Sequence, residues 1–186
     1  MGEILAVGVT HYPPLTGFDD KMTGIMKRML QNPNLPEKYQ DVQNWPAAAR
    51  AEWGADEGTT TAKRHRADLL EWFRKVRTTI DDFRPDFILM WGDDQYENFK
   101  EDVIPPYCIY AYDSIEFGPP PRNVWDESPE LKFHLPGNPA AAKYLANGLL
   151  DAGFDPAYAY KPLHHPLGHA FANAIMYLDY DRTGFN

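Results

Sequence analysis

The sequence predicts an α/β fold: a three-layer domain with a mixed central sheet flanked by helices. Apolar runs alternate with helical patterns in the order strand, helix, strand, strand, helix, strand, helix. The longest amphipathic pattern leads directly into an apolar run, which is typical of an α-to-β connection. A length of 186 residues suits one domain with its own core. We therefore expect residues 1–186 to form a single domain, or the N-terminal portion of a longer one.

The N-terminal third is expected to contain one strand and one regular helix. Residues 3–9 are mostly apolar and indicate a strand. Two aspartates at positions 19 and 20 suit the start of a helix that continues to about Leu30. Residues 32–53 are rich in Pro and Asn, so we expect short helical pieces there at best.

The strongest helical signal covers residues 61–83. Apolar side chains recur there at spacings of four, three, four and three, which places them on one face. They are Leu69, Phe73, Val76, Ile80 and Phe83. The apolar run that follows predicts a buried strand at 86–91.

The C-terminal half is expected to hold two more strands and two more helices. Residues 107–112 and 156–160 indicate strands. Asn138 and Pro139 suit the cap and first turn of a helix that ends near Gly153. Residues 170–178 indicate a last helix.

Charge and composition narrow the classes of partner. A formal net charge of −9 disfavours nucleic acid and anionic membrane surfaces as partners. Cys108 is the single cysteine, so the chain can form no internal disulfide. No signal-peptide pattern and no apolar run of about 20 residues is present, and we expect a cytoplasmic protein.

The residues with the clearest chemical potential follow the predicted strands. After the strand at 86–91 the chain reads Trp91-Gly92-Asp93-Asp94-Gln95-Tyr96-Glu97-Asn98-Phe99. His11 follows the first predicted strand. Ligands of α/β sheets bind beyond such strand ends, and a divalent metal would offset the repulsion between clustered carboxylates. The alternatives are a solvated acidic turn that caps a short helix and a loop histidine bound to backbone.

Further polar and aromatic residues accompany this cluster. His164, His165 and His169 follow the last predicted strand, and a histidine near a substrate can act as acid or base. Pro166 and Gly168 argue against a helical zinc motif there. Several tyrosines crowd the same strand ends, either as core packing or as the wall of an aromatic pocket: Tyr12, Tyr96, Tyr107, Tyr110 and Tyr112.

These motifs together resemble the class III extradiol ring-cleavage dioxygenases, the superfamily of the catalytic subunit of protocatechuate 4,5-dioxygenase. The resemblance covers almost the whole chain. It rests on four stretches: Val9-Thr-His-Tyr-Pro-Pro-Leu15, Asp94-Gln-Tyr-Glu-Asn-Phe99, Asp102-Val-Ile-Pro-Pro-Tyr-Cys108 and Gly168-His169-Ala170.

The resemblance implies an iron-dependent oxidoreductase of aromatic compound catabolism. A non-haem Fe(II), held by two histidines and a carboxylate, would act with O2 on a catecholic or aminophenolic substrate. By position His11 is a metal ligand, Gln95 stands where a second histidine is usual, and His169 is the catalytic residue at the substrate. Glu97 is a further candidate metal ligand. The expected substrate-binding residues are Tyr12, Tyr96 and Arg122, the last because a guanidinium can hold a carboxylate.

Two departures from the family pattern keep other functions open. Gln95 offers iron a poorer ligand than imidazole, and the family's carboxylate ligand and main acid–base histidine lie in a later part of the chain. The chain is therefore a fragment, or a second chain supplies those groups, or catalysis is lost. The expected partners include such a second chain or a homo-oligomer. A non-catalytic partner subunit or ligand-binding module is the main alternative. A metal-dependent hydrolase is a weaker one.

Overall fold

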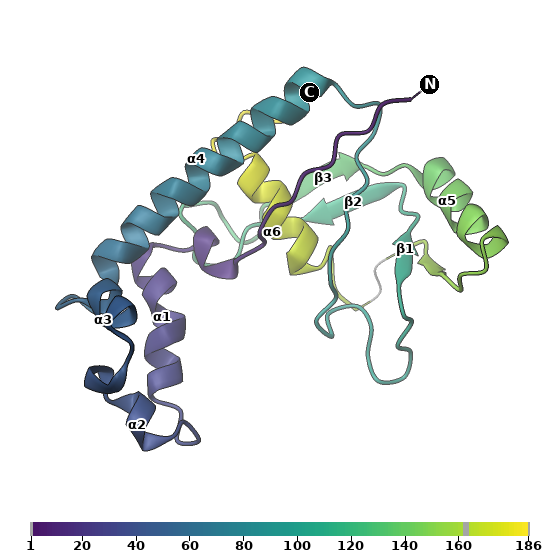
Figure 1. Cartoon of the computed structure of the whole chain (residues 1–186). Coiled ribbons are helices and arrows are strands. Elements are labelled where there is room, and N and C mark those ends of the chain that lie inside the picture. Colours follow the sequence, from purple (N-terminus) through teal and green to yellow (C-terminus); the bar gives the residue numbers. More distant parts are fainter. Residues whose placement is uncertain (1, 162–163, 186) are drawn as a thin grey trace.

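The computed structural model describes residues 2–161 and 164–185 and has an α/β fold (Figure 1). Six α-helices, two short 3-10 helices and four strands occur in this part of the chain. In chain order they are η1 (Pro13–Thr16), α1 (Asp19–Leu30), α2 (Glu37–Gln40), η2 (Val42–Asn44), α3 (Ala47–Trp53), α4 (Thr59–Phe83), β1 (Cys108–Tyr110), β2 (Ser114–Phe117), β3 (Phe133–Pro136), α5 (Pro139–Asp151), β4 (Ala157–Ala159) and α6 (His169–Leu178). The α/β class is thus confirmed.

The strands pair in both directions, as a mixed arrangement requires. β1 and β4 are parallel, with Cys108 opposite Ala157. α5 immediately precedes β4 in the chain and packs against β1. β2 and β3 are antiparallel, with Ser114 opposite Pro136. Each pair is its own two-stranded sheet. β1 and β4 lie inside the predicted ranges 107–112 and 156–160, whereas β2 and β3 were not predicted.

The predictions of strands at 3–9 and 86–91 are wrong: neither segment forms regular secondary structure. Figure 1 shows them as plain traces, one at the N-terminus and one after α4. Within residues 2–161 and 164–185, neither segment makes a backbone hydrogen bond to another strand. Ile4 is 93% exposed and Leu89 63% exposed. An apolar run becomes a strand only when another strand satisfies its backbone, and here none does so.

The four longer helices confirm the helical predictions. α1 has the predicted bounds, and α4 begins two residues before the predicted start. The Asn138 side chain caps α5 by accepting the Ala141 backbone N–H at 3.0 Å. Of the helices in the described ranges, none combines the length and apolar character needed to cross a bilayer.

The core lies where α4 meets α1 and α6. Phe73 of the predicted apolar stripe is buried there, edge-on to Tyr177 of α6 at a ring separation of 5.3 Å. Leu15 and Met176 complete this centre. Burying such side chains contributes about 1.5–3 kcal/mol each, so this contact holds α6 in place against α4.

Arg77 lies outside the predicted apolar stripe of α4 and is nevertheless buried. The side chain is buried, and its guanidinium donates to Asp81 at 2.8 Å and to the Leu178 carbonyl at 3.3 Å. It also lies 3.5 Å from Asp179 at the end of α6. A buried cation needs such partners, and these couple α4 to the end of α6.

Candidate metal and substrate site

Three segments distant in sequence meet at the candidate site. His11 Nε2 lies 3.6 Å from Asp93 Oδ1, although 81 residues separate the two along the chain. The ring of His11 also meets that of His169, at the start of α6, with centroids 5.1 Å apart and planes at 72°. The structure thus brings together an imidazole, a carboxylate and a second imidazole, all partly accessible to solvent.

Glu97 fixes His169. Its carboxylate accepts the His169 backbone N–H at 3.0 Å and lies 3.0 Å from Nδ1 of the same residue. An ionised carboxylate only accepts hydrogen bonds, so Nδ1 carries a proton in this pairing. Nε2 of His169 is then the nitrogen available to a ligand.

α6 also holds the backbone on either side of the His11–Tyr12 peptide. Asn173 donates to the His11 carbonyl at 3.1 Å, and the Tyr177 hydroxyl donates to the Tyr12 carbonyl at 2.7 Å. Sequence reasoning missed both residues. A usable signal for Asn173 existed, because it is an amide inside the apolar run of α6 and buried polar groups have partners.

Asp94 organises the loop rather than facing a ligand. It accepts backbone N–H groups from Glu97 at 3.1 Å, Asn98 at 2.8 Å and Phe99 at 3.2 Å. This is the turn-capping role anticipated as the alternative for the acidic cluster. These hydrogen bonds fix the backbone of the loop and so position the Glu97 side chain beside His169.

Gln95 contacts the site through Asp93. Its amide donates to Asp93 Oδ2 at 2.7 Å. This hydrogen bond is the main cause that lowers the pKa of Asp93 below its ordinary value, and the nearby His11 and His169 act in the same direction. Asp93 is therefore ionised at neutral pH and is available as an anionic oxygen donor.

Two glycines allow the close approach of loop and helix. A Cβ on Gly168 would lie 2.9 Å from Glu97 Oε2. A Cβ on Gly92 would lie 3.1 Å from the ring of Phe171. Because Gly92 and Gly168 lack a side chain, α6 can lie directly against the acidic loop.

The predicted substrate-binding residues lie in different places. Arg122 pairs with Asp20 of α1 at 3.2 Å, and its side chain is 72% exposed. The structure therefore does not bring Arg122 into the group around His11. Tyr96 is in the same loop as Glu97 but is 60% exposed, with a left-handed backbone (φ 60°). Tyr12 lines a cavity between α1 and α4, with its ring centroid 6.4 Å from that of His65.

The other histidines and tyrosines of the predicted cluster are also placed. His165 Nδ1 lies 3.0 Å from the Pro166 carbonyl, and His164 is exposed. Tyr110 stacks on Tyr112 at 4.8 Å and packs against Phe171 of α6. Burial raises the pKa of Tyr112 to about 12. Tyr110 and Tyr112 therefore pack in the interior rather than line the group around His11.

Two of the residues fit a metal, but a full ligand set is not formed. Within the described ranges, no group of three or more His, Cys, Asp or Glu side chains is arranged to hold an ion. His11 and Asp93 offer a nitrogen and an anionic oxygen side by side, which suits Fe(II). Glu97 is engaged by His169, and Gln95 presents its amide nitrogen to Asp93.

Comparisons with known proteins find relatives among dioxygenases. Three matching proteins are named 2,3-dihydroxyphenylpropionate/2,3-dihydroxicinnamic acid 1,2-dioxygenase. Those from Rhodococcus sp and Rhodococcus jostii strain RHA1 are 31% and 32% identical over 106 residues, which are 57% of this chain and 30% of each relative. The one from Comamonas testosteroni is 31% identical over 104 residues, which are 55% of this chain and 28% of the relative. The match thus spans less than a third of each relative. No family model matches, and no solved structure gives a significant match. These partial similarities support a relation between this chain and aromatic-ring dioxygenases.

Proposed function

We propose that this chain carries part of the active site of a non-haem Fe(II)-dependent, extradiol-type ring-cleaving dioxygenase. The substrate would be a catecholic or aminophenolic aromatic, with O2 as co-substrate. The observation that carries the proposal is the convergence of His11, Asp93 and His169 from three distant segments. The similarity to dioxygenases named for dihydroxylated aromatic acids supports it.

His11 and Asp93 would hold the metal, with Gln95 and Glu97 as further candidate ligands. When bound, Fe(II) supplies redox chemistry with O2 that amino-acid side chains lack. The Gln95 amide lowers the pKa of Asp93 and so favours its anionic form. A rotation of that amide would present its oxygen in place of its nitrogen.

His169 would act on the substrate. Its Nδ1 is held by Glu97, so Nε2 is free to accept a proton from a ring hydroxyl and to return it. Protonated His169 would remain paired with an anionic carboxylate, which stabilises the positive charge. The Glu97–His169 pair thus gives this chain an acid–base group beside the proposed metal ligands.

The second candidate function is a non-catalytic partner subunit or ligand-binding module of a dioxygenase. It is favoured by Gln95 in place of the usual histidine and by the incomplete ligand set among the described residues. It requires a stable complex with a second chain. Size-exclusion chromatography with light scattering on the native preparation would detect that complex, and a strictly monomeric protein would count against it.

Oxygen consumption tests the first function. Iron-loaded protein is mixed anaerobically with catechol, 2-aminophenol or 3-(2,3-dihydroxyphenyl)propionate, and O2 is then admitted. We expect O2 uptake together with the absorbance of a ring-opened product, and a fall of at least about 100-fold in His169→Gln. His134→Gln is the control, because His134 is an exposed histidine on β3. Intact iron-loaded protein, with any missing portion of the active site restored, that consumes no O2 with any of the three would reject the proposal.

A further inference from the structure

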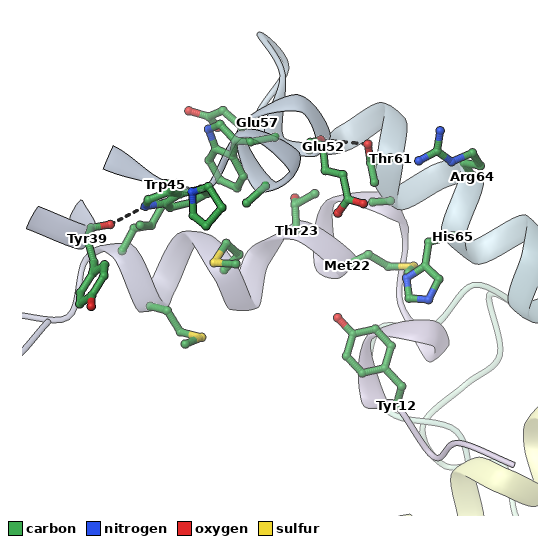
Figure 2. Close-up of a pocket in the computed structure, with 18 of the residues that line it drawn as sticks. Tyr12, Met22, Thr23, Tyr39, Trp45, Glu52, Glu57, Thr61, Arg64 and His65 are labelled. Atoms are coloured by element: carbon green, nitrogen blue, oxygen red, sulfur yellow. Dashed lines mark hydrogen bonds between the residues drawn. The ribbon is translucent and has the colours of Figure 1, made fainter. Parts of the chain in front are cut away.

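A cavity of about 760 Å³ lies between α1, α3 and α4, apart from the group around His11 (Figure 2). Tyr12 contributes to its wall, whereas the side chains of His11, Asp93 and His169 are not among those that line it. A volume of this size can accommodate a small organic molecule. This space is separate from the proposed metal ligands and from His169.

Most side chains that line the cavity are apolar, and a hydrogen bond holds one of them in place. Met22 and Met26 of α1 line it together with Trp45 and Trp53, whose rings meet edge-on at 5.5 Å. Trp45 Nε1 donates to the Tyr39 carbonyl at 2.7 Å, which fixes the indole in the wall. Aromatic faces and polarisable methionine side chains bind aromatic and branched apolar groups well.

The charges at the cavity are mainly negative. Glu52, Glu57 and Asp68 line it together with one guanidinium, that of Arg64. Glu57 is neutralised by Lys27 at 2.7 Å. Within residues 2–161 and 164–185, the carboxylates of Glu52 and Asp68 make neither an ion pair nor a hydrogen bond.

Figure 2 shows how these groups are directed. The Glu52 carboxylate points into the space beside Met22 and His65, whereas the Arg64 guanidinium points away from His65 and Tyr12. The Glu52 backbone is fixed from the other side, because Thr61 Oγ1 donates to its carbonyl at 2.9 Å. Glu52 is exposed, so the solvent-accessible side of the cavity combines an unpaired anion with aromatic faces.

We propose that this cavity binds an organic cation: an ammonium group beside Glu52, carried on an aromatic body that lies against Trp45 and Met26. Charge complementarity selects the cation, because the carboxylates of Glu52 and Asp68 lack partners of their own within the described chain. The indole faces add cation–π attraction. The proposal does not rest on the dioxygenase function, since binding is measured without iron or O2.

Three probes with one ring system and different charges test the proposal. They are 1-naphthylmethylamine as the cation, 1-naphthalenemethanol as the neutral analogue and 1-naphthylacetate as the anion. Isothermal titration calorimetry at pH 7 gives each dissociation constant. We expect the cation to bind about fivefold more tightly than the alcohol and the anion to bind most weakly. Equal affinities, or no binding of the cation up to about 5 mM, would overturn the proposal.

Variants locate the binding. Glu52→Gln is expected to reduce cation affinity about fivefold and to leave alcohol affinity unchanged, whereas Glu130→Gln, remote from the cavity, has no effect. Ala49→Trp places a side chain into the cavity and should abolish binding of both, whereas Ala48→Trp on the exposed part of α3 should not. If Glu52→Gln does not fold, Asp68→Asn gives the same comparison. Unchanged cation binding in folded Ala49→Trp would overturn the proposal.

Discussion

Glu97 Oε2 lies 3.0 Å from Nδ1 of His169, and the same carboxylate also accepts the His169 backbone N–H. One side chain thus fixes the ring orientation of the histidine and caps the start of α6. The pair is only partly accessible to solvent, with Glu97 17% and His169 26% exposed.

Glu97→Ala removes both interactions. We expect the free energy of unfolding to fall by about 1–3 kcal/mol, because a partly buried N–H at the start of α6 loses its acceptor. Chemical denaturation monitored by circular dichroism measures the change. Glu101→Ala, an exposed glutamate in the same loop region, is the control and should differ by less than about 0.5 kcal/mol. Equal effects of the two substitutions would contradict the role assigned to Glu97.

Tyr177→Phe tests how α6 supports the segment that carries His11. Tyr177 is 1% exposed and its hydroxyl donates to the Tyr12 carbonyl at 2.7 Å. Its loss leaves that carbonyl without its buried donor, so we expect about 1–2 kcal/mol of destabilisation. Tyr144→Phe on α5, where the tyrosine is 83% exposed, should be neutral. A Tyr177→Phe protein as stable as the wild type would show that this bond does not hold the segment.

Arg77 and Arg74 are a matched pair on α4. Both donate to aspartate, but Arg77 is buried against the end of α6, whereas the side chain of Arg74 is 55% exposed in its pair with Asp181. We expect Arg77→Met to cost about 1–3 kcal/mol and Arg74→Met less than about 1 kcal/mol. Urea unfolding curves of the two variants give the comparison. A larger loss of stability in Arg74→Met than in Arg77→Met would contradict the role assigned to the buried Arg77.

Alkaline pH should destabilise the protein. Burial raises the pKa of Cys108 to about 11 and that of Tyr112 to about 12, and it also raises the pKa of Tyr177. In the unfolded chain such groups lose their protons at lower pH, so the unfolded state is favoured as pH rises. Stability should be full below about pH 8.5 and decline from there to about pH 12. Melting temperatures across this range, with Cys108→Ala as a comparison, measure it. A flat profile would contradict the burial of these groups.

The local and the non-local parts of the fold differ in how far the sequence predicts them. The bounds of α1 and the apolar stripe of α4 follow from residue spacing and from acidic residues in the first helical turn, which are local signals. Residues 3–9 and 86–91 have the composition of strands, but a ladder needs a neighbouring strand that composition does not reveal. β2 and β3 were missed for the related reason that their pairing joins segments across a Pro-rich loop.

The site divides in the same way. His11 and the acidic stretch were predicted as candidates from their positions after apolar runs. Their meeting, with Asp93 rather than Gln95 beside His11, depends on how α6 packs. The sequence left two roles open for the acidic stretch that contains Asp94: metal ligand, or cap of a turn. The three backbone N–H groups that donate to the Asp94 carboxylate support the capping role.

The exposed apolar segments give a prediction of their own. Leu89 is 63% exposed in a segment without a hydrogen-bonded neighbour among the described residues, and such edges promote aggregation. Leu89→Lys should raise the concentration at which the protein aggregates, with little change in melting temperature. Leu150→Lys, at a 52% exposed leucine on α5, is the control. Static light scattering against concentration measures both, and an equal gain from the two would assign no special role to the segment that contains Leu89.

The central claim is that His11 and Asp93 form the metal-binding end of the site, and anaerobic titration with Fe(II) tests it most directly. Calorimetry should show one Fe(II) bound per chain. The affinity should fall by about 10–100-fold or more in His11→Ala and Asp93→Asn and remain unchanged in His134→Ala. Fe(II) affinity that is unaffected by the loss of His11, or the absence of binding to the wild-type protein, would contradict the account.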